Sequence, residues 1–373
     1  MHLFSLIFLP AAAYQLLALF AAARHLLKRA RHGSDPNLAF QPGVSVLKPL
    51  RGLDPNTREA FVSQIQQDYP DFEILFGVSD SADPAADEVR RLQRDFPDSA
   101  IRLIVGSAAA PNGKVGILME LARHARNPVW VVNDSDIKVD AVYLREIVAP
   151  LANHEIGLVT CPYHAQTHTM AAAWEGLGIA TDFMPSTLVA PLLGVREFGL
   201  GSTLAFRAAD LERAGGFAGL AEYLADDYQL AKRITALGKR ALLSTYTVET
   251  SLGDATWMGV WRHQLRWART IRISKGKAYA GLPIAQAGVW ILVALATGAD
   301  IPALLLFLLR LGSAFLSAAW VLRSAAATRS FWLAPVWDLY AFAVWVVSYA
   351  GREVRWRDRR LLIDRDGRIQ PVS

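Results

Sequence analysis

Short apolar runs alternate with amphipathic stretches through residues 43–250. The runs have the length and composition of buried strands, and the stretches between them have the spacing of amphipathic helices. The predicted strands are Val44–Leu47, Phe72–Val78, Ile101–Val105 and Val129–Val132. The predicted helices are Pro55–Gln67, Pro84–Asp95, Lys114–Arg126 and Ala141–Leu151. This alternation predicts an α/β fold with a mostly parallel sheet covered by helices.

A long apolar stretch, Leu3–Leu27, lies near the N-terminus. It is long enough to cross a bilayer, which takes about 20 apolar residues in a helix. A cleaved signal peptide has basic residues before its apolar run, whereas here Arg24 and Lys28 come at or after its end. We therefore expect a transmembrane anchor over residues 1–27, with residue 28 onward on the cytoplasmic side.

Three more apolar segments predict C-terminal membrane helices over residues 282–350, followed by a basic tail over residues 351–373. The segments are Leu282–Thr297, Ile301–Leu322 and Trp332–Ala350. Counted with the anchor, four full spans would place the tail outside, against the positive-inside rule. One segment is therefore expected to be re-entrant or interfacial, and the short first one is the candidate. The arginines of the tail are Arg352, Arg355, Arg357, Arg359 and Arg360.

Two of these segments carry ionisable residues, Arg310 and Asp338. An ionisable side chain at membrane depth usually faces protein or water rather than lipid. We expect Arg310 and Asp338 to pair across adjacent helices. The alternative is that one of the helices only lies at the membrane interface.

Composition agrees with a membrane-associated chain. Of 373 residues, 53% are hydrophobic and only 20% are charged, which excludes a disordered or collagen-like protein. A single cysteine excludes an intramolecular disulfide. The net charge of +5 suits anionic partners, and much of the positive charge flanks the apolar segments. Lipid head groups are therefore expected partners and nucleic acid is not.

Carboxylates follow two of the predicted strands. Asp80 comes after Phe72–Val78, and Asp134 and Asp136 come after Val129–Val132. Ligands of parallel sheets bind at the carboxyl ends of strands. Two carboxylates two residues apart are ligands that Mg²⁺ or Mn²⁺ takes together with substrate phosphates. For Asp80 the alternative is an ordinary helix cap or turn.

A third acidic position is Asp226-Asp227, where another helix is expected to begin. Acidic residues favour the first turn of any helix, which is one interpretation of the pair. The other is that Asp227 is a general base that takes a proton from an attacking hydroxyl.

Residues 255–281 predict an amphipathic, interfacial helix that carries the sequence WRHQLRW. Arg266 lies one turn from Arg262, and Trp267 adds a flat apolar surface. Arginine can clamp a diphosphate, and tryptophan can stack on a sugar or lie at lipid head groups. The alternative is a basic helix on an anionic membrane, without catalysis.

Taken in order, Asp80, Asp134-Ser135-Asp136, Asp227 and Arg266-Trp267 resemble the pattern D, D(x)D, D, (Q/R)xxRW of inverting GT-A glycosyltransferases. Further segments are similar to the ceramide glucosyltransferase family: VSVLKPLRGLDPN, DYPDFEILFGVSDSADPA, EIGLVTCPYHA and LADDYQLAKRI. The sequence looks most like the bacterial branch, which includes the hopanoid-associated glycosyltransferases. The resemblance implies a Rossmann-like GT-A domain over residues 40–254.

The resemblance also implies a reaction. One sugar, glucose or N-acetylglucosamine, would move from a UDP-sugar to a lipid hydroxyl, on a hopanoid polyol or ceramide, at the cytoplasmic face of a bacterial inner membrane. Asp80 would hold the uracil or ribose, and Lys114 would lie near the nucleotide. Asp134 and Asp136 would hold a divalent metal, Mg²⁺ or Mn²⁺, and the diphosphate. Asp227 would be the base, and Arg266 and Trp267 would close over leaving group and acceptor.

Two positions depart from the family pattern. His263 stands at the Gln/Arg position of the motif, where an imidazole can still donate to phosphate. Met184-Pro185 stands where the animal ceramide enzymes have His-Pro, which favours a hopanoid acceptor over ceramide.

The apolar stretch Met170–Val195 carries two prolines and is too interrupted for a span. It is expected to be an interfacial helix beside the acceptor or an ordinary core helix. Residues 199–203 are expected to approach the donor sugar or simply to form a turn.

Two other functions remain open at this point. A processive polysaccharide synthase of the same superfamily would need a membrane channel and the glutamine motif that His263 interrupts. A membrane-anchored module that binds nucleotide or lipid without catalysis would not need an acid beyond the metal pair.

Overall fold

The structure is a computed structural model that describes residues 6–32, 39–107, 109–356 and 359–371. It divides into two compact units. We call residues 32–163 and 196–251 the sheet unit, and residues 1–31, 164–195 and 252–373 the helical unit. Residues 1–5 of the predicted anchor and Arg357 of the basic tail lie outside the described residues. Residues 164–195, within the predicted domain 40–254, belong to the helical unit.

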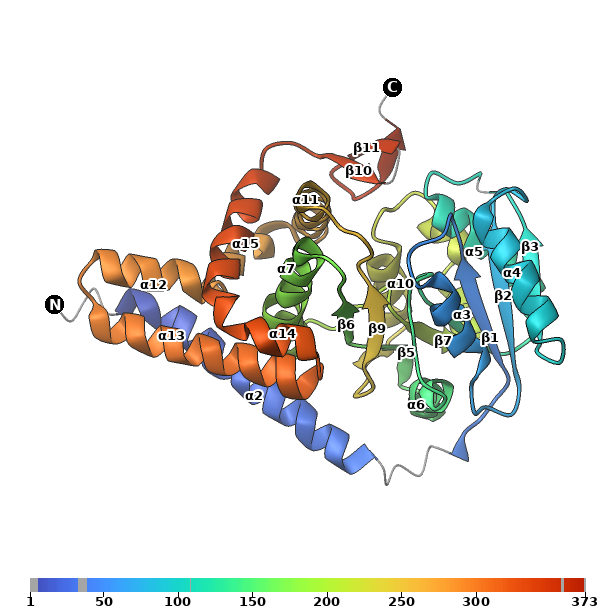
Figure 1. The fold of residues 1–373 in the computed structure, drawn as a ribbon, viewed down its shortest axis with the longest axis horizontal. Helices are drawn as coiled ribbons and strands as arrows, with labels where there is room; N and C mark the ends of the chain where they lie inside the picture. The colour runs from blue at the N-terminus through green and yellow to red at the C-terminus, as the bar shows by residue number, and fades with distance from the viewer. Residues whose placement is uncertain (1–5, 33–38, 108, 357–358, 372–373) are drawn as a thin grey trace. The chain divides into compact units, whose positions relative to one another are not determined.

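The sheet unit is built on a seven-stranded sheet with the order β3-β2-β1-β4-β7-β5-β8 (Figure 1). Only β7 runs against its neighbours, since β4 and β5 both pair with it antiparallel and the other pairings are parallel. The mostly parallel sheet is therefore confirmed. The strands are β1 Val44–Pro49, β2 Phe72–Val78, β3 Ile101–Val105, β4 Val129–Val132, β5 Ile156–Thr160, β7 Leu204–Arg207 and β8 Arg240–Leu243. The strands β6 Tyr163–Gln166 and β9 Val248–Ser251 lie outside this sheet.

Helices cover both faces of the sheet, because successive residues of each strand point to opposite sides. In β2, Ile74 and Phe76 join one hydrophobic cluster and Leu75 joins the other. Local signals start the helices: the Asp83 side chain accepts from the Ala85 amide ahead of α4, and the Asn112 side chain accepts from the Val115 amide ahead of α5. The helices are α3 Thr57–Ile65, α4 Pro84–Asp95, α5 Gly113–His124, α6 Tyr143–Val148, α9 Ala208–Arg213 and α10 Asp226–Thr235.

The helical unit consists of helices and one small sheet. The helix α12 packs against α13 and α15, and α11 packs against α15. The helices are α2 Leu9–His32, α7 Met170–Gly178, α8 Met184–Val189, α11 Trp257–Lys275, α12 Ala287–Ala296, α13 Asp300–Phe315, α14 Ala325–Ser330 and α15 Ala334–Ser348. The predicted basic tail contains a three-stranded antiparallel sheet of β10 Glu353–Trp356, β11 Arg359–Ile363 and β12 Ile369–Pro371.

Three helical stretches of the described chain are long and apolar enough to cross a membrane: Met170–Leu193, Asp300–Val321 and Ala325–Ser348. The last two overlap predicted segments. A fourth candidate is the pair Trp257–Ile284 and Ala287–Ala296, bent by 44°. A bend of this kind fits a broken span or the re-entrant segment expected near Leu282. The described part of the predicted anchor forms the continuous helix α2, which is not among these candidates, so the anchor stays a prediction.

By length and composition Met170–Leu193 is a candidate span, although its two prolines were expected to interrupt the segment. Proline has no N–H to donate and normally breaks a helix. Here a wide π-helical stretch, Ile179–Phe183, precedes Pro185, and a 3₁₀ turn, Ala190–Leu193, contains Pro191. These local changes of helix type carry the chain past both prolines.

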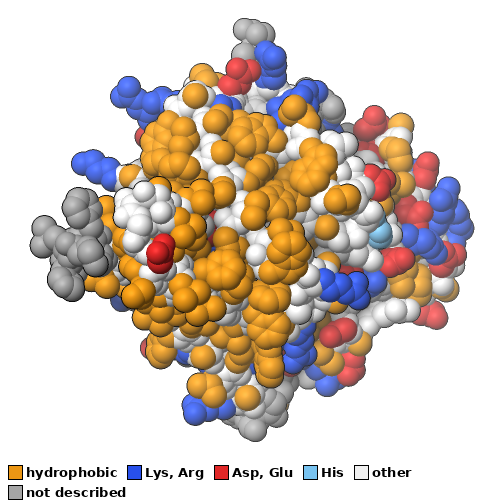
Figure 2. Space-filling view, turned by 60° about the vertical axis from the view of Figure 1, so that its left-hand side comes forward, with side chains coloured by type: hydrophobic (Ala, Val, Ile, Leu, Met, Phe, Trp, Pro, Cys, Tyr) orange, Lys and Arg blue, Asp and Glu red, His pale blue; other side chains and the backbone are white. Residues whose placement is uncertain are grey.

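One face of the helical unit is strongly apolar, and Figure 2 shows hydrophobic side chains gathered on a broad face. Soluble proteins rarely expose large contiguous apolar patches. The exposed side chains of α12, α13 and α15 explain the excess of hydrophobic residues and indicate membrane association. They are Leu292, Val293, Leu295, Ile301, Leu304, Leu305, Phe307, Leu308, Phe315, Val336 and Val346.

The predicted pair of Arg310 and Asp338 is confirmed. Arg310 Nε donates to Asp338 Oδ2 at 2.9 Å, and Nη2 donates to Oδ1 at 2.6 Å. Both side chains are buried, at 3% and 1% exposure. Arg310 also donates to the carbonyl of Thr181, and Asp338 accepts from the amide of Gly288. The pair therefore joins α13, α15, α12 and the π-helical stretch.

Candidate functional site

Lys114 holds two of the acidic positions of the sheet unit together. Its Nζ lies 2.8 Å from Asp134 Oδ1 and 3.2 Å from Asp226 Oδ2. Burial lowers the pKa of Lys114, but the charges of Asp134 and Asp226 outweigh burial and hold the pKa above its ordinary range. Lys114 therefore stays positively charged. It lies in the first turn of α5 and joins the loop after β4, through Asp134, to the start of α10, through Asp226.

A second lysine, Lys48 on β1, contacts the loop that follows β4. Its side chain is fully buried, and Nζ donates to Asn133 Oδ1 at 2.9 Å and to the carbonyl of Asp134 at 3.0 Å. Burial lowers the pKa of Lys48 to about 7, against the charges of Asp136 and Asp134. Sequence reasoning missed this residue. The available signal was a lysine inside an otherwise apolar strand, because a buried amine requires a polar partner.

Asp136, the second member of the predicted metal pair, is half-buried. Its Oδ2 accepts from Thr250 Oγ1 at 2.5 Å. Burial raises the pKa of Asp136, and the charge of Asp134 raises it further. The described residues contain no group of three or more His, Cys, Asp or Glu able to hold a metal ion. Mg²⁺ and Mn²⁺ need only one or two protein carboxylates when substrate phosphates supply further ligands. A divalent cation would relieve the repulsion between Asp134 and Asp136, so these residues fit the predicted metal.

Asp227 has the electrostatics of a general base. It lies in the first turn of α10, and its Oδ1 accepts from the amide of Tyr228 at 2.7 Å. Burial raises the pKa of Asp227 to about 6, the charge of Asp226 adds to this, and Lys114 opposes it. A carboxyl group with such a pKa is ionised at neutral pH yet basic enough to take a proton.

The glycine segment 199–203 packs directly against these acidic residues. A Cβ on Gly201 would lie 2.8 Å from Asp134 Oδ2, and one on Gly199 would lie 2.7 Å from the carbonyl of Asp227. The amide of Asp134 also donates to the carbonyl of Gly201 at 3.2 Å. Both glycines are therefore needed for close packing of the backbone against Asp134 and Asp227.

Asp80 lies at the same edge of the sheet as the loop after β4. The strands β2, β1 and β4 are parallel neighbours, and Asp80 and Asp134 each follow the carboxyl end of their strand. Asp80 is exposed, and its Oδ1 accepts from the amide of Ala82 at 2.9 Å. This is the turn contact of the alternative interpretation. Binding of uracil or ribose stays a prediction.

His263, Arg266 and Trp267 lie on α11 in the helical unit. The His263 ring lies 4.6 Å from that of Trp267 between centroids, and Trp267 lies 5.7 Å from Phe183. His263 Nδ1 lies 2.6 Å from Glu175 Oε1. Sequence reasoning gave Glu175 no role, although a carboxylate inside the apolar stretch 170–195 indicates that a polar partner exists. Met184 is buried in the same unit.

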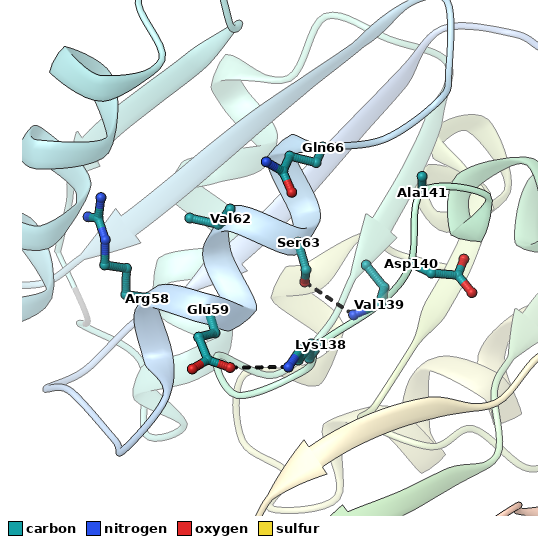
Figure 3. A pocket seen from close by; sticks show the side chains of 9 residues that line it. All are labelled: Arg58, Glu59, Val62, Ser63, Gln66, Lys138, Val139, Asp140 and Ala141. Carbon is teal, nitrogen blue, oxygen red and sulfur yellow. Dashed lines mark hydrogen bonds and ion pairs between the residues drawn. The ribbon is translucent and has the colours of Figure 1, made fainter.

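A surface hollow of about 510 Å³ lies elsewhere on the sheet unit (Figure 3). It is lined by α3 and by residues 138–141. Its Lys138 is paired with Glu59 at 3.1 Å, and its Ser63 accepts from the amide of Val139 at 3.1 Å. None of the predicted site residues lines it, and its charged side chains Arg58, Glu59, Lys138 and Asp140 already have partners.

Known proteins resemble the chain in sequence and in fold. The sequence profile of the family described as Glycosyl transferase family 21 matches residues 4–369. Ceramide glucosyltransferase 1 of Caenorhabditis elegans is 29% identical over 244 residues, which are 65% of this chain and 52% of that protein. Ceramide glucosyltransferase 3 of the same organism is 28% identical over 209 residues, 55% of this chain and 45% of that protein. The chain thus spans about half the length of the curated relatives it matches.

Among solved structures, the mannosyltransferase PcManGT of Pyrobaculum calidifontis, in complex with GDP-Man and Mn²⁺, aligns with a TM-score of 0.53. The alignment covers 91% of this chain and 98% of that chain at 20% identity. At this identity the likeness concerns the fold alone, and it agrees with the GT-A architecture of the sheet unit.

Proposed function

The chain belongs to Glycosyl transferase family 21, and on that premise we propose that it moves one sugar, glucose or N-acetylglucosamine, from a UDP-sugar to the hydroxyl of a membrane lipid. One observation carries the proposal: Asp227, with a pKa raised to about 6, lies near Lys114, which pairs with Asp226 and with the strand-end carboxylate of Asp134. These residues combine a base with groups suited to a metal and an anionic leaving group.

The donor would be held by groups at the carboxyl edge of the sheet. Asp134 and Asp136 would hold a divalent metal, and Lys114 would add its positive charge near the nucleotide. Asp80 would contact the uracil or ribose. A bound divalent cation would neutralise negative charge on the departing diphosphate. Lys48 donates to the carbonyl of Asp134, which fixes the backbone of this loop.

The acceptor would be activated by Asp227. Transfer with inversion requires a base on the face of the sugar opposite the leaving group, and that base removes the proton of the attacking hydroxyl. Arg266 and Trp267 would close over the leaving group and the acceptor.

The acceptor would be a lipid, because the helical unit exposes an apolar face. The curated relatives are named ceramide glucosyltransferases, which supports ceramide, whereas Met184 in place of a histidine supports a hopanoid polyol. We place the enzyme in a bacterial inner membrane, with the sheet unit on the cytoplasmic side.

The test is to supply membranes that contain this chain with UDP-glucose or UDP-N-acetylglucosamine, and with ceramide or a hopanoid polyol. Mass spectrometry is expected to find a lipid carrying one added sugar, and membranes with the Asp227→Asn variant should lack it. A ladder of several sugars would favour a processive synthase. Absence of any product or UDP release would favour a binding module.

The rate is also expected to depend on Lys114 through the pKa of Asp227. The base must be ionised, so kcat/KM should fall as the pH drops below about 6. Lys114→Met removes the cation that lowers this pKa, so the fall should begin at a higher pH in the variant. A pH profile of kcat/KM measures the shift.

The matched control is Lys239→Met, because Lys239 pairs with Asp210 in the same unit, at 2.6 Å and with similar burial. Its profile should keep the wild-type midpoint. An unshifted profile in Lys114→Met would contradict the assignment of Asp227 as the titrating base.

A further inference from the structure

A buried carboxylate and an imidazole form a dyad in the helical unit. Glu175 lies on α7 and His263 on α11, and Glu175 Oε1 accepts from His263 Nδ1 at 2.6 Å and from Gln264 Nε2 at 2.8 Å. The Glu175 side chain is 3% exposed and that of His263 is 28% exposed. A ligand can therefore reach His263, while Glu175 acts only through it.

The dyad fixes which nitrogen of His263 faces outward. An ionised carboxylate only accepts hydrogen bonds, so Nδ1 carries the proton that Glu175 Oε1 receives. In the neutral imidazole Nε2 is then a hydrogen-bond acceptor. The hydrogen bonds found for His263 within the described residues use Nδ1. The structure thus offers a ligand an acceptor whose direction is set by a second residue.

Aromatic rings surround the dyad. His263 packs on Trp267, and Trp267 packs on Phe183. On the α7 side, Trp174 contacts Tyr340 at 5.9 Å between ring centroids. The hydroxyl of Tyr340 is buried and has no hydrogen-bond partner within the described part of the chain. Aromatic surface beside an oriented polar group suits an amphipathic ligand.

Charge selects a neutral head group over a phosphate. When the imidazole of His263 is neutral, the dyad has a net charge of −1 from Glu175. When the imidazole is protonated, the net charge of the dyad is zero. The dyad is therefore never positively charged. Buried Glu175 would repel a phosphate at His263. The dyad itself therefore adds no attraction for a phosphate, and Arg266, one turn further along α11, is the residue expected to contact the diphosphate. A hydroxyl or amide N–H of a lipid is uncharged, so it can donate to Nε2 without repulsion from Glu175.

We propose that Glu175 is a positioning residue that orients His263, and that His263 Nε2 accepts a hydrogen bond from a hydroxyl or amide N–H on the head group of the acceptor lipid. This inference rests on the proposed lipid glycosyltransferase function. The dyad is assigned recognition of the acceptor head group only, and no chemical step is assigned to it.

The test uses the full chain in lipid nanodiscs with UDP-glucose or UDP-N-acetylglucosamine, and with ceramide or a hopanoid polyol as acceptor. Glu175→Gln is expected to raise the acceptor KM about tenfold, the effect of one lost oriented hydrogen bond, while the donor KM stays unchanged. His263→Gln supplies an amide oxygen that does not depend on Glu175. In that background, adding Glu175→Gln should change the acceptor KM less than twofold.

Glu88→Gln is the matched control, because Glu88 is a buried, paired glutamate of the sheet unit with 8% exposure. It should leave both KM values unchanged. The proposal would be overturned by a rise in donor KM with an unchanged acceptor KM in Glu175→Gln. A loss of thermal stability with both KM values unchanged would overturn it too. If the wild-type chain glycosylates neither lipid, both the proposed function and this inference are refuted. The two outcomes named above for Glu175→Gln would refute the inference alone.

Discussion

Replacing Asp227 with asparagine is expected to slow sugar transfer by a factor of about 10²–10⁴, the usual contribution of a general base, while UDP-sugar binding is retained. Asparagine has the shape of aspartate and can still accept from the Tyr228 amide. It cannot take a proton at neutral pH. The link between Lys114 and the carboxylates of Asp134 and Asp226 remains intact in the variant, so the donor site should keep its charge pattern.

Two measurements separate chemistry from binding in this variant: the transfer rate at saturating lipid and donor, and the Kd for the UDP-sugar by calorimetry. Asp87→Asn is the matched control, since Asp87 is an exposed carboxylate paired with Arg90 on α4. It should have wild-type values in both assays. Full activity of Asp227→Asn would refute the base assignment. Equal losses of rate and donor affinity would instead make Asp227 a donor ligand.

Much of the sheet unit follows from local sequence signals. The strands β2, β3 and β4 and the helix α4 have the predicted bounds, because each is followed within two residues by a Gly, Pro, Asp or Asn that stops regular structure. The antiparallel insertion of β7 between β4 and β5 was not predictable in this way. It depends on pairing between segments far apart along the chain.

The residues of the candidate site differ in the same way: some were predictable from local sequence, and others depend on distant partners. The carboxyl ends of parallel strands meet at one edge of a sheet, and this rule was enough to select Asp80, Asp134 and Asp136. The roles of Lys48 and Glu175 depend on partners 85 and 88 residues away. A lone buried charge in the sequence indicates that a partner exists but not which residue it is.

The second large effect is expected inside the helical unit, at the buried pair of Arg310 and Asp338. Arg310→Met leaves the Asp338 carboxylate without its cation at 1% exposure, and Asp338→Asn leaves the guanidinium without its anion at 3% exposure. Each single change should lower the free energy of unfolding by about 3–5 kcal/mol, because an uncompensated buried charge is far more costly than a missing pair. The double variant should lose much less than the sum, since no isolated charge remains.

Denaturant unfolding of the purified chain in detergent micelles measures this cycle, and Arg240 with Glu155 gives its matched comparison. That pair has a similar separation, 3.0 Å, but its side chains are 58% and 72% exposed. Arg240→Met and Glu155→Gln should each change the free energy of unfolding by at most about 1 kcal/mol, because water solvates whichever charge is left. If the two buried changes were additive, Arg310 and Asp338 would not act as a unit. A coupling found only in the buried pair would show that burial, rather than ion-pair geometry, determines how strongly the two helices depend on each other.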